Sequence, residues 1–93
     1  MRPFHSKEWR QSARGQECAG RFDRCLWSPE TVVLCHIRRP GDGKATKPSD
    51  YKAAYLCANC HHDQEVRKVV PWDQILDAVF RTLDIHHKEG RIG

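Results

Sequence analysis

The sequence predicts a small α+β domain in which two short strands precede a helix, with a further amphipathic helix at the C-terminus. The chain has 93 residues, the length of a single small domain. Residues 31–37 are rich in β-branched side chains, residues 51–57 suit a second strand, and the polar, Gly-free residues 58–68 suit a helix. Apolar residues at helical spacing mark a last helix over residues 71–90. The ββα core therefore spans residues 31–68.

The segments around this core carry turn and cap signals. Residues 1–12 are polar and are expected to form a loose arm, although Ser6 can cap a short helix that runs to Arg14 and ends at Gly15. Two prolines and two glycines over residues 38–50 predict a long loop between the strands.

The C-terminal helix begins at Pro71, which suits a first helical turn, and Gly90 offers its end. We expect its apolar stripe to pack on the rest of the domain; alternatively it is the face of a homodimer. We expect His86 and His87 to be exposed near the helix end, where the macrodipole favours cations. The stripe consists of Ile75, Leu76, Val79, Phe80 and Leu83.

The composition argues against a membrane protein and leaves the core short of stability. Hydrophobic residues make up 39% of the chain, and no stretch approaches the roughly 20 apolar residues that cross a bilayer. The N-terminal residues lack the apolar core of a secretory signal, so we expect a cytoplasmic protein. So small a core needs a disulfide, a metal or a partner. In a reducing compartment, paired cysteines favour the metal.

Positive charge is concentrated in the first half of the chain. Residues 1–50 hold ten of the 16 Lys and Arg but six of the 12 Asp and Glu, so the net charge of +4 resides there. This excess fits a polyanion such as DNA, and it equally fits an ordinary basic surface. One cluster of cations on the first strand end and the loop would contact DNA phosphates, or would only keep the loop soluble. Its members are Arg38, Arg39, Lys44 and Lys47.

Four of the five cysteines form two pairs. Cys57 and Cys60 make a C-x2-C turn, and Cys18 and Cys25 make a wider pair. Four thiolates in a closed tetrahedral set are typical of structural zinc, whose binding contributes directly to folding. Two alternatives stay open: reduced buried thiols, or a redox pair, although no thioredoxin-like pattern surrounds the C-x2-C turn. Cys35 is left over.

Two histidines can come together around the predicted hairpin. His36 lies near the end of the first strand, and His61 directly follows the C-x2-C turn. The hairpin would place a histidine base opposite a metal-binding histidine, with Asp50 from the loop between them. Taken alone, each histidine is more often a packing or surface residue.

The three tryptophans are assigned from their neighbours. We expect Trp27 and Trp72 in the core, where they would cover the cysteine pairs and the start of the last helix. Trp9 suits the core and an exposed arm equally. The three do not form the aromatic ladder of a single-strand binder.

Four motifs in fixed order carry a resemblance to a known family. They are residues 12–18, 29–38, 46–50 and 57–61. The pattern is similar to the HNH nucleases of the His-Me finger superfamily, and more closely to the small nuclease family of lambdoid prophages typified by YbcO. Similarity covers about residues 12–91. The resemblance implies a zinc-stapled ββα-metal fold, a DNA substrate and a phage or prophage protein acting in a bacterial cytoplasm.

The resemblance assigns roles by position. His36 matches the general base that takes a proton from the attacking water. His61 matches the last histidine of the motif and would hold a divalent ion separate from the zinc. Asp50 lies near the residue that orients the base. Cys35 departs from the pattern, because many members have an Asp metal ligand there and thiolate is a poor ligand for Mg²⁺.

Cys35 leaves three possibilities for the catalytic ion. The ion is softer than Mg²⁺ or Mn²⁺, for example Zn²⁺ or Ni²⁺; His62 or Asp63 completes its shell; or catalysis is lost. The resemblance thus implies a metal-dependent DNA endonuclease. The alternative is a noncatalytic zinc module that keeps the fold and binds DNA or protein. Such a module has no need for His36 and His61 together.

Overall fold

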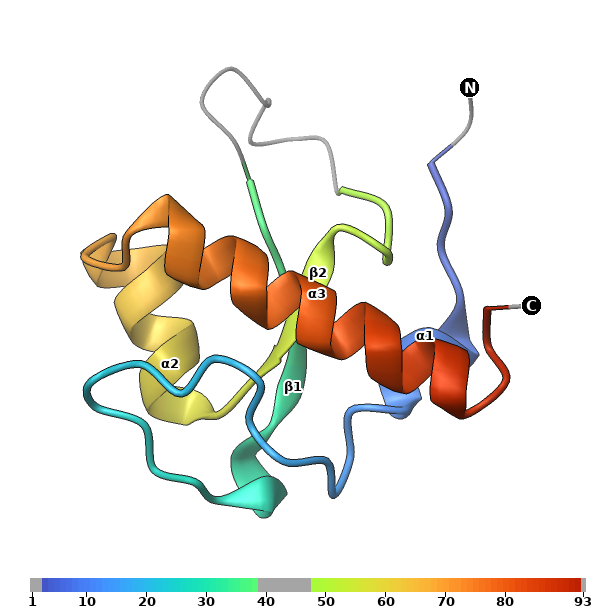
Figure 1. Ribbon diagram of the computed structural model, residues 1–93, viewed down its shortest axis with the longest axis horizontal. Coiled ribbons are helices and arrows are strands. Elements are labelled where there is room, and N and C mark those ends of the chain that lie inside the picture. Colours follow the sequence, from blue (N-terminus) through green and yellow to red (C-terminus); the bar gives the residue numbers. More distant parts are fainter. Residues whose placement is uncertain (1–2, 39–47, 93) are drawn as a thin grey trace.

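The computed structural model describes residues 3–38 and 48–92 and confirms the predicted α+β class (Figure 1). It contains two strands, three α-helices, a 3-10 turn and a π-helical turn. In chain order these are α1 (Lys7–Gln11), the 3-10 turn η1 (Pro29–Thr31), β1 (Val33–His36), β2 (Ala53–Leu56), α2 (Ala58–His62), the π-helical turn η2 (Asp63–Arg67) and α3 (Trp72–Lys88).

The two strands form an antiparallel sheet at the centre of the molecule. Val33 pairs with Leu56 at one end of the ladder and His36 pairs with Ala53 at the other. Every residue of β2 is buried, whereas β1 is buried only at Cys35. The alanines and bulky side chains of β2 therefore serve the core, and β1 is left to present polar side chains at its end.

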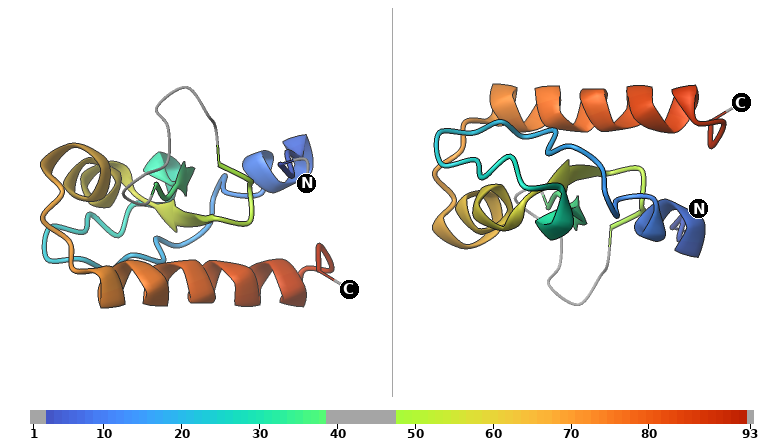
Figure 2. Two further views of the ribbon diagram at one scale, coloured as in Figure 1. Left: turned by 90° about the horizontal axis from the view of Figure 1, so that it is seen from above. Right: turned by 90° about the horizontal axis from the view of Figure 1, so that it is seen from below.

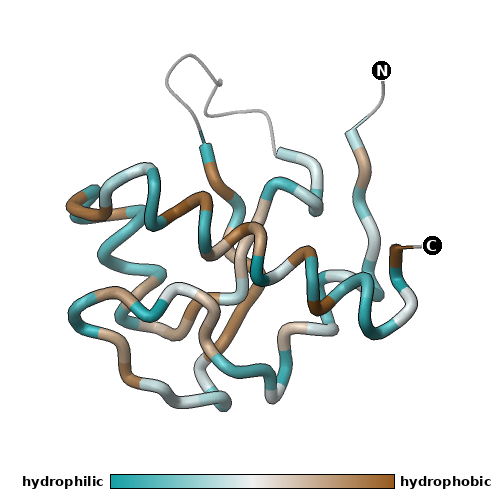
Figure 3. Tube along the Cα trace, viewed as in Figure 1, coloured by the Kyte–Doolittle hydropathy of each residue, from teal (hydrophilic) through white to brown (hydrophobic). Residues whose placement is uncertain are grey.

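Helix α3 covers one side of this sheet. Figure 2 shows α3 as a layer of its own, with the strands, α1 and α2 beside it, and Figure 3 shows hydrophobic and hydrophilic segments alternating along it. Thr82 is fully buried and its hydroxyl accepts the Tyr55 N–H at 3.0 Å while donating to the Ala78 carbonyl at 2.8 Å. The helix thus satisfies a backbone donor on the outer edge of β2. Within the described part of the chain, no helix has the length and apolarity needed to span a membrane.

The N-terminal segment differs from the loose arm expected over residues 1–12. Its first described residues pack on the end of the interstrand loop: the Phe4 N–H donates to Ser49 Oγ at 2.9 Å and the Asp50 N–H donates to the Phe4 carbonyl at 2.7 Å. Ser6 caps α1 as predicted, accepting the Trp9 N–H at 3.4 Å. Phe4 lies more than forty residues from Ser49 and Asp50, so local sequence patterns do not reveal these two contacts.

The predictions for Trp27, Trp72 and His86 are wrong, and Trp9 takes the core alternative of its two. Trp9 is buried and stacks on His86 with ring centroids 4.0 Å apart. Trp27 and Trp72 are 59% and 46% exposed. His86 is fully buried because it continues the i, i+4 spacing of the buried face of α3, whereas His87 is exposed as expected.

Candidate functional site

The four predicted cysteines come together at one end of the molecule. Cys18 and Cys25 lie on the segment between α1 and η1, and Cys57 and Cys60 lie at the start of α2. Their sulfur atoms are all within 4.8 Å of one another, and Cys25 and Cys57 are 3.9 Å apart. A tetrahedral zinc with Zn–S bonds of about 2.3 Å separates its sulfurs by about 3.8 Å. This set can therefore hold a metal ion such as zinc.

Backbone N–H groups point at these sulfurs. Cys57 Sγ accepts from the Leu26 N–H at 3.4 Å, and Cys25 Sγ accepts from the Trp27 N–H at 3.4 Å. The Cys57 N–H in turn lies 3.2 Å from Cys18 Sγ. Trp27 has a left-handed backbone conformation, with φ of 52°. Such N–H donors stabilise thiolates, the form that binds metal.

The cysteines differ in acidity. Burial alone would raise the pKa of Cys57, but hydrogen bonds from the Cys60 and Leu26 N–H groups outweigh it and lower the pKa to about 7. Burial raises the pKa of both Cys60 and Cys25, and the proximity of Cys18 adds to both shifts. The Cys57 thiolate therefore forms readily, whereas a bound cation would be needed to deprotonate Cys25 and Cys60 at neutral pH.

A second set of ligand atoms gathers beside β1. The ligand atoms of Cys35, His61 and Glu65 all lie within 4.8 Å of one another. His61 and Glu65 face each other across one turn of α2 and η2, with the imidazole Nε2 in contact with a carboxylate oxygen. Cys35 is buried, whereas the side chains of His61 and Glu65 are 38% and 50% exposed. One sulfur, one nitrogen and one oxygen suit a borderline ion such as Zn²⁺ better than Mg²⁺.

Cys35 is a thiol in this set. Burial raises its pKa to about 12, with a further contribution from the negative charge of Glu65. Its Sγ lies 3.4 Å from Gln64 Oε1, a contact in which the thiol donates. A bound dication reverses this balance, because its charge favours the thiolate.

The third member of this set was not foreseen. His62 is exposed, and Asp63 is held by Arg24 at 3.2 Å and by Arg67 at 3.0 Å. Glu65 joins Cys35 and His61 instead. The signal for it was the i, i+4 spacing of His61 and Glu65 at a helix, which places both side chains on one face.

His36 forms a separate hydrogen-bonded unit with Asp50. The Asp50 carboxylate is fully buried, and its Oδ1 lies 2.7 Å from His36 Nε2. Its Oδ2 accepts from the Ser6 N–H at 2.6 Å and from Arg10 Nη1 at 3.1 Å. His5 Nδ1 is 3.8 Å from Oδ1. Arg10, Ser6 and His5 were not predicted, since the arm was not expected to pack here.

The surroundings of Asp50 keep it ionised. Burial would raise its pKa, but the Ser6 N–H, the hydrogen bond and charge of His36, and the charge of Arg10 together lower it. A carboxylate at this position accepts the Nε2 proton of His36. When the ring is neutral, this hydrogen bond leaves the lone pair on Nδ1. The His36 side chain is 15% exposed, so a small solute can reach it.

The predicted residues thus divide into two neighbouring groups. Asp50 pairs with His36, while His61 groups with Cys35 and Glu65. Cys35 and His36 are consecutive in β1, where adjacent side chains point to opposite faces. The two groups therefore flank the end of one strand. Of the four predicted DNA-binding cations, Arg38 is exposed just after this end, and Arg39, Lys44 and Lys47 lie outside the described residues.

Comparison with known proteins identifies the family. The family model "Putative nuclease YbcO" matches residues 7–91. The chain belongs to the YbcO family. It is 45% identical over 60 residues to "Putative nuclease YbcO" of Escherichia coli strain K12 and, equally, to "Putative nuclease ybcO" of Enterobacteria phage 82. Each alignment covers 62% of this chain and spans 62% of the length of the relative.

A solved structure has a similar fold. It is titled "Structure of a putative bacteriophage protein from Escherichia coli str. K-12 substr. MG1655", is 37% identical, and superposes with a TM-score of 0.71 over 89% of this chain and 100% of its own. The predicted relationship to YbcO proteins is therefore confirmed. The family carries the name of a nuclease and includes a phage protein.

Proposed function

We propose that this YbcO-family protein is an HNH-type endonuclease that hydrolyses DNA phosphodiester bonds. One observation supports the proposal most. His36 pairs with the buried, ionised Asp50, and it directly follows Cys35 in β1. Cys35 in turn belongs to the group of three metal-ligand residues with His61 and Glu65. A base and a metal beside each other are what hydrolysis of a phosphodiester requires.

In this proposal His36 is the general base. Its Nε2 proton is held by Asp50, so Nδ1 accepts the proton of a water whose oxygen attacks the phosphorus. The Asp50 carboxylate stabilises the imidazolium that forms, and Arg10 and Ser6 fix the carboxylate in place. The new P–O bond forms as the bond to the leaving oxygen breaks, and that oxygen is protonated from solvent.

Cys35, His61 and Glu65 would hold the catalytic ion. When bound, a divalent cation supplies positive charge for the phosphate and the leaving oxygen. The exposed side of His61 and Glu65 leaves room for substrate and water. With a thiolate in the set we expect Zn²⁺ or Ni²⁺ to support activity better than Mg²⁺ or Mn²⁺.

The four-cysteine cluster is proposed as a structural zinc site. It would connect the segment that carries Cys18 and Cys25 to the first turn of α2, where Cys60 directly precedes His61. Its role is therefore to hold the helix that presents His61, separately from the catalytic ion. Arg38, Arg39, Lys44 and Lys47 are proposed to contact DNA phosphates, with salt-dependent and largely sequence-independent affinity.

Phage or prophage origin and action in a bacterial cytoplasm complete the proposal. A single chain with one such site would nick one strand of DNA. A homodimer through α3 would carry two sites and could cut both strands.

A noncatalytic zinc module that binds DNA or protein is the second candidate. It is favoured by one observation, the buried Cys35 thiol with its pKa raised to about 12 at a position where a carboxylate would serve Mg²⁺ better.

Cleavage assays distinguish the two candidates. Supercoiled plasmid and branched DNA are incubated with the wild type and with His36→Ala in Mg²⁺, Mn²⁺, Ni²⁺ or Zn²⁺. We expect cleavage by the wild type and a loss of at least about a hundredfold in His36→Ala, the usual contribution of a general base. His62→Ala, which changes an exposed neighbouring histidine, is the matched control and should cut normally. Equal activity of the wild type and His36→Ala, or none with any ion and substrate, would refute the nuclease.

A further inference from the structure

Helix α3 carries a second apolar stripe that the domain does not cover. One face of the helix, with Ile75, Ala78, Thr82 and His86, is buried. Successive residues of a helix are rotated by about 100°, so Trp72, Leu76, Phe80 and Leu83 share another face, roughly a quarter turn away. Trp72, Leu76 and Phe80 are 46%, 50% and 58% exposed. We name this second face the outer stripe.

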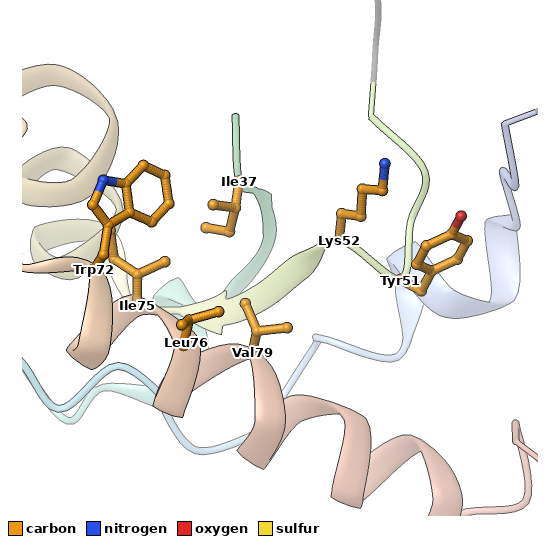
Figure 4. Close-up of a pocket in the computed structure, with 7 residues that line it drawn as sticks. All are labelled: Ile37, Tyr51, Lys52, Trp72, Ile75, Leu76 and Val79. Atoms are coloured by element: carbon orange, nitrogen blue, oxygen red, sulfur yellow. The ribbon is translucent and has the colours of Figure 1, made fainter. Parts of the chain in front are cut away.

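A groove of about 640 Å³ runs beside the outer stripe. Figure 4 shows side chains of α3 pointing toward the end of β1 and the residues that precede β2. Trp72, Leu76 and Val79 form the helix side, and Ile37 and Lys52 form the other. The walls are mostly apolar, so the groove suits a bulky hydrophobic side chain. Lys52 places a positive charge on this border of the stripe.

The opposite border of the outer stripe is acidic. Asp73, Asp77 and Asp84 are all exposed, and the helical rotation places the three together on the side away from the groove. The stripe is therefore bordered by carboxylates on one side and by Lys52 on the other.

We propose that the outer stripe binds the same stripe of a second copy of this chain, with the two α3 helices parallel. A two-fold axis that lies in the interface and runs along the stripe places opposite borders together, so the acidic border of each copy faces the Lys52 border of the other. Exposed aromatic side chains such as Phe80 then enter the groove of the opposite copy. The pairing is self-complementary in both shape and charge.

Charge and area favour this occupant over others. The three carboxylates would repel the phosphates of DNA laid along α3. The half-exposed side chains of the outer stripe offer roughly 300–400 Å² of apolar surface. A stable interface buries about 800 Å² per partner, so the groove walls and charged borders must contribute as well. We therefore expect a dimer of moderate affinity that dissociates on dilution.

Sedimentation velocity of the full chain tests the proposal without any cleavage assay, so its result is independent of the nuclease function. The wild type should pass from monomer to dimer between low micromolar and several hundred micromolar concentration. Leu76→Glu should raise the dissociation constant at least about 30-fold, as expected for a central interface residue. Val33→Glu, which adds the same charge at an exposed position on β1, 44% exposed, is the control and should dimerise normally. Far-UV circular dichroism confirms that each variant is folded.

Charge reversal tests the parallel geometry. Lys52→Glu alone and Asp77→Lys alone should each weaken the dimer, and the double variant should regain most of the affinity because every facing pair is again opposite in sign. A double variant no tighter than the single ones would overturn the geometry. A wild type that stays monomeric throughout, or a Leu76→Glu variant that dimerises normally, would overturn the proposal. Monomers whose DNA affinity falls with Leu76→Glu would assign the stripe to DNA instead.

Discussion

The two groups of metal-ligand atoms in this protein are built on opposite plans. Cys18, Cys25, Cys57 and Cys60 form a complete set of four like ligands, three of them buried. The group with Cys35 has three unlike ligands, two of which are partly exposed. A closed set of four leaves a metal no position for a substrate, whereas an incomplete set does.

This difference indicates different roles: the four-cysteine cluster would stabilise the fold, and the open group would serve the proposed cleavage. The four-cysteine cluster joins two segments that are distant in the sequence, so its metal would act on folding. The other group lies where β1 ends, next to His36, and only its Cys35 belongs to the core, whereas the side chains of His61 and Glu65 are partly exposed. The comparison therefore predicts that the two groups respond differently to the same kind of substitution.

Loss of one cysteine of the closed set should have the largest effect. Cys57→Ser should lose the bound zinc and the cooperative unfolding transition, because structural zinc contributes about 10 kcal/mol or more, comparable to the whole stability of a small domain. Metal analysis and thermal melts followed by circular dichroism measure both. Cys35→Ser is the matched control and should keep about one zinc per chain and a cooperative transition. A folded wild type that contains no metal would contradict the structural role.

His86, near the end of α3, gives a prediction about stability that does not depend on a metal. Burial, assisted by the charge of Arg91, lowers the pKa of His86 to about 4 from 6.5. Between these values the unfolded chain binds a proton that the folded chain does not, so the free energy of unfolding should fall by roughly 3 kcal/mol as the pH is lowered from 7 to 4. Urea unfolding at several pH values measures it.

Two variants isolate this contribution. His86→Gln removes the titrating group and should flatten the pH dependence relative to the wild type. His87→Gln changes the exposed neighbour and should leave the dependence as it is. If both variants follow the wild type, the buried His86 is not the source.

Substitution in the open set should have the smallest effect on folding and a specific effect on cleavage. Glu65→Gln should lower the cleavage rate about a hundredfold at fixed metal concentration, because it weakens a ligand of the catalytic ion. The melting temperature should stay within a few degrees of the wild type, since Glu65 is half exposed. Glu30→Gln removes a carboxylate that is fully solvated and is the control. An unfolded Glu65→Gln would mean that the two groups do not differ as described.

Local patterns predicted the parts of the fold whose determinants are close in sequence. β-branched residues predicted β1, the apolar spacing predicted α3, and the C-x2-C turn with its distant cysteine pair predicted the four-cysteine cluster. The strands and helices are shorter than expected: β1 covers Val33–His36 and α2 covers Ala58–His62 before the π-helical turn. Strand ends depend on the ladder partner, which local sequence does not define.

The candidate site was predictable only in part, for the same reason. His36, Asp50 and His61 were predicted to lie together; the structure pairs His36 with Asp50 and groups His61 with Cys35 and Glu65, because the strand end directs neighbouring side chains to opposite faces. Arg10 and Ser6 reach Asp50 from the N-terminal segment, and Trp9 reaches His86 from 77 residues away. Such contacts depend on tertiary packing, which local sequence patterns do not reveal.

The hydrogen bond between Ser6 and Asp50 makes the orientation of His36 depend on a contact between an early and a later part of the synthesised chain. The two residues are 44 positions apart, and the first ten residues leave the ribosome well before Asp50 is available to receive them. The buried carboxylate that orients His36 therefore gains its backbone donor only late in folding. A chain that lacks Ser6 and Arg10 would have the histidine but not its fixed orientation, so the proposed DNA cleavage should require both residues.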